Sequence, residues 1–212
     1  MPPAPTTTPD RATALIDFWF GPPDDPGREQ HREIWFRATE EFDATLQREF
    51  LGDYEAAAAG ALGSWEASPE GALGLVLLLD QVPRNIFRST PRAYAADAAA
   101  RAVADRALER RFDRQVPPAW RLFFYMPFHH SEDLADQRRS VALFGTLPRN
   151  PDRRGSLRRY GRPYIEVIQR FGRFPHRNEI LGRQSTAAEV AFLAEAAALR
   201  ASDQSGTGSR SA

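Results

Sequence analysis

Apolar residues along the chain recur at intervals of three or four positions, the spacing that places them on one face of an α-helix. Phe42, Leu46 and Phe50 show this most clearly, and Thr39 stands before them as a side chain able to cap the helix. No segment alternates apolar and polar residues between hairpin turns, as a half-buried strand would. The pattern therefore predicts an all-α protein with about nine or ten helices.

One predicted helix is apolar on all sides. Residues 72–80, ALGLVLLLD, have no charged position before Asp80, and Ser68 followed by Pro69 is a strong start signal. A helix without a polar face is usually buried in the centre of a protein, and this one is too short to cross a membrane. We expect it to form the middle of the fold.

Capping and stop residues divide the rest of the chain into further helices. Most follow a Ser, Thr or Asp that can cap them or end at a Gly or Pro, and Thr186 with Glu189 forms a capping box before the last. Ser131 is the expected cap of the helix that follows the histidine pair. The predicted segments are 10–21, 39–52, 53–62, 97–111, 120–127, 131–147, 156–171 and 186–200.

Both ends are expected to lie outside a single domain at residues 10–200. Residues 1–9 and 201–212 are small and polar, so they bury too little area to offset their ordering entropy and should be disordered. The opening residues lack the basic and apolar segments of a secretory signal, and no stretch approaches the roughly 20 apolar residues of a membrane span. A soluble cytoplasmic protein without a membrane partner is expected.

Charge and cysteine content exclude several classes of function. The chain has 28 basic and 28 acidic residues, every basic residue is Arg, and there is no Cys, which excludes disulfides, thiolate catalysis and sulfur-ligated zinc. Arginines outnumber acidic residues between positions 138 and 183. The stretch Pro148 to Arg162 is interpreted as a solvated basic loop or, alternatively, as an anion or nucleic-acid surface. No nucleic-acid motif accompanies it, so a nucleic-acid partner is unlikely.

The first polar motif, DQVPRNIFR, follows the buried helix at Asp80 to Arg88. Val82 stands before Pro83, which disfavours helical angles and predicts a break, with Gln81 ending the helix. Buried charges need partners, so in a structural role Asp80 would accept bonds from Arg84, and Asn85 would satisfy loop carbonyls. In a functional role, Arg84 and Arg88 lie four positions apart and would clamp a carboxylate or phosphate.

The second polar motif, RFGRFPHRN, occupies Arg170 to Asn178. Gly172 can end its helix, and the phenylalanines can anchor the turn, so a satisfied helix corner explains the residues. An anion bound at the following helix start would instead meet exposed amides and the side chains of Arg173 and Arg177, with His176 beside them.

A histidine pair, His129 and His130, precedes Ser131 and Glu132. His130 and Glu132, together with the distant Asp80 or His176, have the atoms to bind a metal, but their spacing matches no established signature. Ser131 as an N-cap with acidic residues after it explains the cluster without metal chemistry. We therefore expect neither a metal nor another cofactor.

Four long motifs resemble a known bacterial family, the domain of unknown function 924. They are LIDFWFG at 15–21, LLLDQVPRNIFR at 77–88, FFYMPFHHSEDLADQRRSVALF at 123–144 and FGRFPHRNEILGRQSTAAEVAFL at 171–193. The resemblance implies a tetratricopeptide-like right-handed superhelix of antiparallel helix pairs, and it implies no activity. The segment GDYEAAAAGAL is similar to the first helix of a tetratricopeptide repeat, yet no period of about 34 residues is present. The chain differs from the usual family pattern at Val82, commonly Phe, at His129, often Glu, and at Tyr164, usually His.

Two polar motifs and a histidine pair in one domain predict a shared polar pocket. Our leading interpretation is that this pocket binds a small anionic ligand or a peptide carboxylate. One alternative is a hydrolase with His130 or His176 as catalytic base and arginines stabilising negative charge. Another is a structural or protein-interaction module without a small-molecule site. The candidate ligand-binding residues are Asp80, Gln81, Arg84, Asn85, Arg88, His129, His130, Glu132, Arg173, His176, Arg177 and Asn178.

Overall fold

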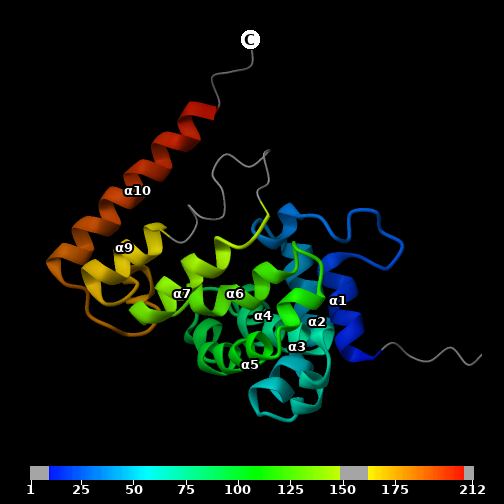
Figure 1. Ribbon diagram of the computed structural model, residues 1–212. Coiled ribbons are helices and arrows are strands. Elements are labelled where there is room, and N and C mark those ends of the chain that lie inside the picture. The colour runs from blue at the N-terminus through cyan, green and yellow to red at the C-terminus, as the bar shows by residue number, and fades with distance from the viewer. Residues whose placement is uncertain (1–9, 149–161, 208–212) are drawn as a thin grey trace, which may run out of the picture.

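The computed structural model describes residues 10–148 and 162–207, and helices connected by turns form all of this described part (Figure 1). The all-α class is therefore confirmed. The expected helix start at Ser156 and most of the basic stretch lie outside the described residues. The α-helices are α1 (Arg11–Phe20), α2 (Glu40–Ala58), α3 (Pro69–Val76), α4 (Val82–Ile86), α5 (Asp97–Glu109), α6 (Arg121–His129), α7 (Leu134–Phe144), α9 (Arg162–Phe171) and α10 (Ala187–Thr207). Shorter helical turns are η1 (Glu33–Trp35), η2 (Gly63–Ala67), η3 (Leu77–Gln81), η4 (Pro91–Tyr94), η5 (Phe112–Gln115) and η6 (Pro175–Arg177).

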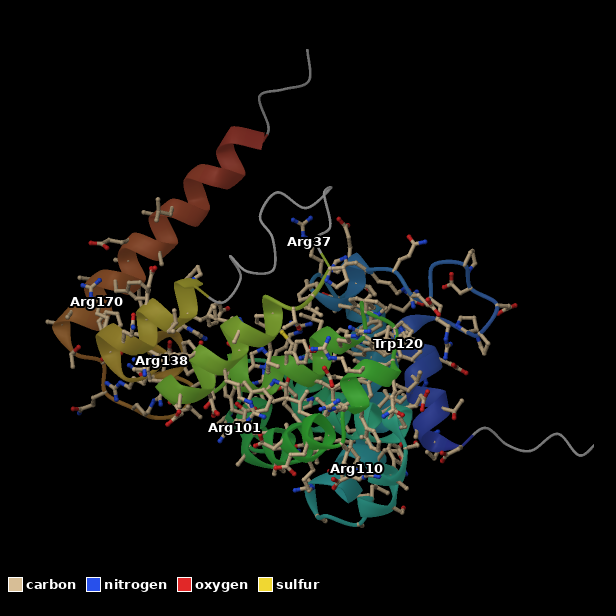
Figure 2. The ribbon with its side chains drawn as sticks, viewed as in Figure 1. Arg37, Arg101, Arg110, Trp120, Arg138 and Arg170 are labelled. Atoms are coloured by element: carbon tan, nitrogen blue, oxygen red, sulfur yellow. The ribbon has the colours of Figure 1, made fainter. Side chains whose placement is uncertain are left out.

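The helix α3 lies at the centre, as its all-apolar sequence predicts. It contacts α1, α5 and α6, and all of Gly71 to Val76 is buried. Aromatic rings of α1 pack against rings at the start of α6. Phe20 stacks on Trp120, which directly precedes α6 and is labelled in Figure 2, with centroids 4.2 Å apart, and Trp19 meets Phe123 edge-on. Such rings bury large apolar areas, so this cluster is a main source of stability. At the other end of the molecule α9 and α10 pack together, and α10 extends outward (Figure 1).

Three predicted helix starts are confirmed by capping bonds. Thr39 accepts a hydrogen bond from the amide of Phe42 at 3.2 Å, and Ser68 accepts one from Gly71 at 3.1 Å. Before α10, the amide of Thr186 donates to Glu189 at 2.7 Å and the amide of Glu189 donates back to the Thr186 hydroxyl at 3.3 Å. Each cap satisfies amides that a helix start leaves without partners.

Two prolines that were expected to end helices lie within them instead. Val82 has helical angles, and α3, η3 and α4 form one continuous helical run through Pro83. Pro127 lies inside α6, whose residues from Leu122 to His129 are all buried. Loss of one backbone hydrogen bond costs less than exposing these apolar side chains would, so tertiary packing keeps both helices intact.

Other predicted boundaries shift by a few residues. Gly52 lies inside α2, so the expected helix at 53–62 is its continuation rather than a separate element. Asp97 is the first residue of α5 and makes no capping bond there. The cap of α7 is Asp133, which accepts from the amides of Ala135 and Asp136, so the prediction of Ser131 was wrong by two positions.

The last helix continues to Thr207, seven residues beyond its predicted end at Arg200. Because residues 201–207 are helical, the expected disordered tail from residue 201 is not borne out for that part of the chain. Among the described helices none is long and apolar enough to cross a membrane. The superhelix and the count of nine or ten helices stay predictions.

Candidate functional site

A cavity of about 240 Å³ opens where α4 and the end of α6 meet the segment that leads into α2. Its polar lining residues come from the first motif and the histidine pair. Its other lining residues are mostly apolar or aromatic. The lining residues are Trp35, Phe36, Ala38, Gln81, Arg84, Asn85, Arg88, Met126, His129, His130 and Tyr164.

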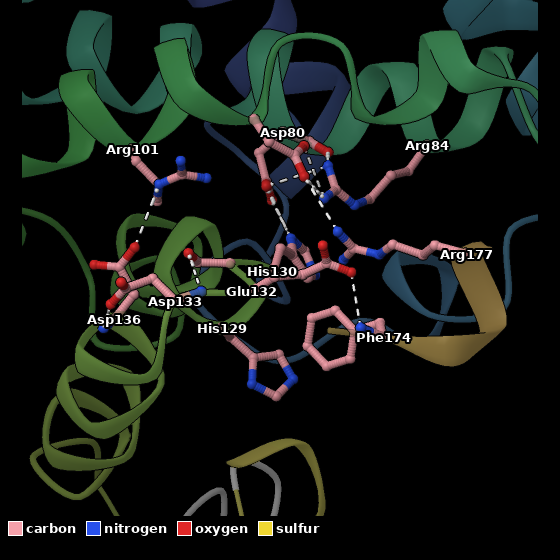
Figure 3. Close-up of polar contacts among 12 residues, drawn as sticks. Asp80, Arg84, Arg101, His129, His130, Glu132, Asp133, Asp136, Phe174 and Arg177 are labelled. Atoms are coloured by element: carbon pink, nitrogen blue, oxygen red, sulfur yellow. Dashed lines mark hydrogen bonds and ion pairs between the residues drawn. The ribbon is translucent and has the colours of Figure 1, made fainter. Parts of the chain in front are cut away.

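Asp80 does not line the cavity but contacts Gln81 and His130, which do, and it is completely buried. Both of its carboxylate oxygens contact Nδ1 of His130, at 2.8 and 3.0 Å (Figure 3). The amide of Gln81 donates to Oδ2 at 2.6 Å, and Nη1 of Arg84 lies 3.2 Å from Oδ1. A buried carboxylate needs such partners, and three side chains supply them here.

These contacts determine the charges of Asp80 and His130. Burial alone would raise the pKa of Asp80, but Arg84, His130 and the hydrogen bonds outweigh it and hold that pKa well below its usual value. Burial and the positive charge of Arg84 together lower the pKa of His130 despite its carboxylate partner. At neutral pH the pair is therefore an ionised carboxylate and a neutral imidazole.

Arg84 joins Asp80 to a second acidic side chain, Asp97 at the start of α5. Its Nη2 lies 2.9 Å from Oδ1 of Asp97, and its Nη1 also donates to the backbone carbonyl of Asp80. Burial lowers the pKa of Arg84, but the two carboxylates outweigh this and raise it. The structural role expected for the Asp80 and Arg84 pair is therefore present.

Arg177 brings the second motif to the same network. Its Nη1 lies 3.6 Å from Oδ2 of Asp97, and its guanidinium sits between the rings of Tyr94 and Phe174, each centroid 4.6 Å away. Burial and the nearby Arg84 lower the pKa of Arg177. The two polar motifs thus converge on Asp97.

Arg88 and Asn85 line the cavity next to an acidic residue of α2. The amide of Asn85 donates to Oδ1 of Asp43 at 2.7 Å, and Nε of Arg88 donates to Oδ2 at 2.8 Å. Asn85 therefore bonds a distant carboxylate rather than the loop carbonyls that were expected. The side chain of Arg88 remains 55% exposed, so part of its guanidinium is open to a further partner.

His129 is the more buried of the two histidines, and in Figure 3 its ring turns away from Asp80. It lies 4.1 Å from the ring of Tyr164 and meets Phe144 edge-on. Burial and the neighbouring His130 lower the pKa of His129 to about 3, so it stays neutral. Tyr164, one of the positions singled out in the sequence, therefore packs against His129.

None of the residues of the second motif, Arg170 to Asn178, lines this cavity. Arg173, a candidate ligand-binding residue, instead binds both oxygens of Glu189, at 2.7 and 2.8 Å. His176 is exposed, and Asn178 donates to the hydroxyl of Ser185 at 3.0 Å. These contacts match the helix-corner interpretation of the motif.

Glu132 also has a structural role outside the cavity lining. It accepts from the amide of Phe174 at 2.7 Å and from two nitrogens of Arg183 at 2.7 and 2.9 Å. Burial would raise the pKa of Glu132, but the bonds from Arg183 and the amide outweigh it and lower that pKa. Because α7 begins only at Leu134, Glu132 lies before the helix and can reach these partners.

A model of the family described as bacterial protein of unknown function (DUF924) matches residues 15–197. The chain belongs to this family. A solved structure of another protein of unknown function, ATU0120 from Agrobacterium tumefaciens, is 38% identical to this DUF924 protein, with a TM-score of 0.77 over 87% of this chain and 97% of that chain. No curated protein matches the chain described here. Neither description names an activity or a ligand.

Several residues of the DUF924 cavity were not predicted. Trp35, Phe36 and Met126 were not among the candidate residues, because an aromatic or Met side chain carries no sign of which cavity it faces. Asp43 and Asp97 were missed because their partners lie 45 and 13 positions away. In the described part of the chain, no three His, Asp or Glu side chains are grouped to hold a metal ion.

Proposed function

We propose that the cavity binds a small molecule with a carboxylate or another anionic group attached to an apolar body. The observation that supports this most directly is that one cavity is lined both by Arg, Asn and His side chains and by aromatic ones. Ligand sites typically combine apolar walls with a few placed polar groups. At about 240 Å³ the cavity is below the roughly 300–1,000 Å³ of sites for drug-sized ligands, which favours a metabolite or one terminal residue of a peptide.

Arg88 is the best candidate to contact the anionic group. Two of its nitrogens bind Asp43, and the guanidinium has five N–H donors in total, so donors remain for a ligand. Arg84 adds positive charge, although Asp80 and Asp97 already bind it. A paired guanidinium–carboxylate contact is strong and directional, so a planar carboxylate is the group expected here.

Phe36 and Trp35 are the best candidates to contact the apolar body. Phe36 is 37% exposed, one of the few large apolar side chains in the described part of the chain with such exposure, and it stacks on His31 at 5.3 Å. Covering exposed aromatic surface adds favourable free energy, at about 25 cal/mol per Å² of apolar area. An aryl or branched alkyl group would do this.

Thermal melting with phenylacetate, and with the neutral phenylacetamide as a matched ligand, tests the proposal. Phenylacetate at about 100 times its dissociation constant should add about 2.7 kcal/mol to the free energy of unfolding, which corresponds to a rise in melting temperature of roughly 5–10 °C. The amide should give a much smaller rise, because it cannot pair with a guanidinium as an anion. Equal shifts for both ligands, or no shift with either, would contradict the proposal.

The variant Arg88→Ala should remove most of the phenylacetate shift. Its unliganded melting temperature should change little, because an exposed ion pair contributes about 0–1 kcal/mol. Arg92→Ala is the matched control: the Arg92 side chain is also 55% exposed and has one carboxylate partner, Glu55, but it does not line the cavity. A shift that survives in Arg88→Ala would refute the role of this residue.

A further inference from the structure

His130 has one ring nitrogen bound and one left for the cavity. Asp80 is ionised and can only accept hydrogen bonds, so Nδ1 of His130 must carry the proton that lies between them. In the neutral ring Nε2 then has a lone pair and no proton. Since His130 lines the cavity and turns Nδ1 to Asp80 behind it, Nε2 is the nitrogen available to a bound molecule. The buried carboxylate thus selects the tautomer.

The charged and titratable groups around His130 keep it neutral near pH 7. Asp80 in η3 and Asp97 in α5 favour its protonated form, whereas Arg84 in α4 and burial oppose it more strongly. His129, beside it in α6, is neutral and adds no charge. A base must be unprotonated to accept a proton, so His130 is in the required state at neutral pH.

The cavity that His130 lines also contains positively charged side chains, which would stabilise negative charge on a substrate that has lost a proton. Arg84 and Arg88 both line it, together with the amides of Gln81 and Asn85. Gln81, Arg84 and Asn85 belong to the continuous helical run that carries Asp80, and Arg88, just after its end, is held by Asp43. Groups that are held in place before reaction stabilise a developing anion effectively.

We propose that His130 is a catalytic general base, held in position by Asp80, that removes a proton from the apolar body of a small molecule bound in this cavity. Nε2 takes the proton, the electron pair of the broken bond stays on the substrate, and Arg84 and Arg88 stabilise the resulting negative charge. The proton then leaves Nε2 for solvent or returns to the product. This activity rests on the proposed function, because the substrate must first bind the cavity, but binding alone does not require it.

The ring opening of 5-nitrobenzisoxazole tests the base without knowledge of the natural substrate. Removal of one C–H proton breaks the N–O bond and releases a coloured cyanonitrophenolate, with no co-reactant. The protein should accelerate this reaction over buffer. His130→Gln should lower kcat about 100-fold or more, the lower end of what general acid–base catalysis usually contributes. In the wild type, kcat should rise with pH and level off below the usual histidine pKa of 6.5, since that of His130 is lowered.

Asp80→Asn separates positioning from folding. It should lower kcat with little change in KM, and it should move the acidic limb of the pH profile to lower pH, because loss of the carboxylate lowers the pKa of His130 further. A merely structural role would leave the profile of the folded fraction unchanged. Circular dichroism at the assay temperature confirms that the variant is folded.

Binding of the probe is measured in parallel by tryptophan fluorescence, since Trp35 lines the cavity. If the wild-type protein binds the probe but does not accelerate its reaction, the proposal that His130 is a general base is refuted, whereas the proposed binding function is not. A protein that binds neither the probe nor phenylacetate would overturn both. Activity that persists in His130→Gln but disappears in His176→Gln would place the base at the exposed histidine and also refute the proposal.

Discussion

Replacing Asp80 with Asn should destabilise the protein by about 3 kcal/mol at pH 7. The substitution keeps the size of the side chain and removes its charge, so the buried Arg84 loses one of its two carboxylates. Removing one partner of a buried ion pair usually costs about 3–5 kcal/mol, and the remaining contact of Arg84 with Asp97 at 2.9 Å places this case at the lower end. For a domain of this size that is a fall in melting temperature of roughly 6–12 °C.

The pH dependence gives this prediction a second test. The pKa of Asp80 in the folded protein is below its ordinary value of 3.8, so its contribution to stability is fully present above that pH and is lost on further acidification. Urea unfolding of both proteins should show a constant difference between about pH 5 and 8 that shrinks below about pH 4. A difference under about 1 kcal/mol at pH 7, or one that grows in acid, would refute the ion-pair reasoning.

Three further predictions concern the rest of the protein. Gly71→Ala should destabilise by about 1–3 kcal/mol, because its Cβ would lie 2.1 Å from the backbone oxygen of Trp65, whereas Gly52→Ala inside α2 has open space and should stabilise by about 0.5–1 kcal/mol; urea unfolding measures both. Thr186→Ala should remove the α10 cap, cost about 1 kcal/mol and speed amide exchange in the first turn of that helix. Zinc, manganese and magnesium, added after chelation, should each move the melting temperature by much less than the roughly 5–10 °C expected for a specific bound ion.

Local signals in the sequence predicted helix starts well and helix ends less well. Thr39, Ser68 and Thr186 cap their helices through bonds to residues three positions away, so their effect depends on short segments alone. Pro83 and Pro127 were expected to end helices. That expectation used only a local effect, the absence of a backbone N–H donor at each proline. Whether the helix continues depends on the apolar surface buried on either side, which only the packed structure reveals.

In the candidate site, too, contacts between residues close in the sequence could be predicted, whereas contacts between distant residues could not. Asp80 and Arg84 lie four apart, a spacing that brings side chains together on any helix, and the structure has this pair. Asp97 and His130 join them from other helices, and no local rule specifies which distant residues meet. Arg173 shows the opposite outcome, since a carboxylate of its own corner binds it away from the cavity.

The backbone around Asp80 explains why this site lies in the middle of a buried helix. In η3 the amide of Val82 donates to the carbonyl of Leu77, five positions back, which is a π turn rather than an α turn. In a regular α-helix the ring of Pro83 would clash with the carbonyl four positions earlier, and the wider turn accommodates it. The same turn leaves the carbonyl of Asp80 for the side chain of Arg84, so one guanidinium binds both the backbone and the carboxylate of Asp80. Pro83 thus gives the π turn a structural cause, and the turn places Asp80 against His130 beside the cavity. Because π turns occur often at functional sites, this position agrees with the role proposed for Asp80 and His130.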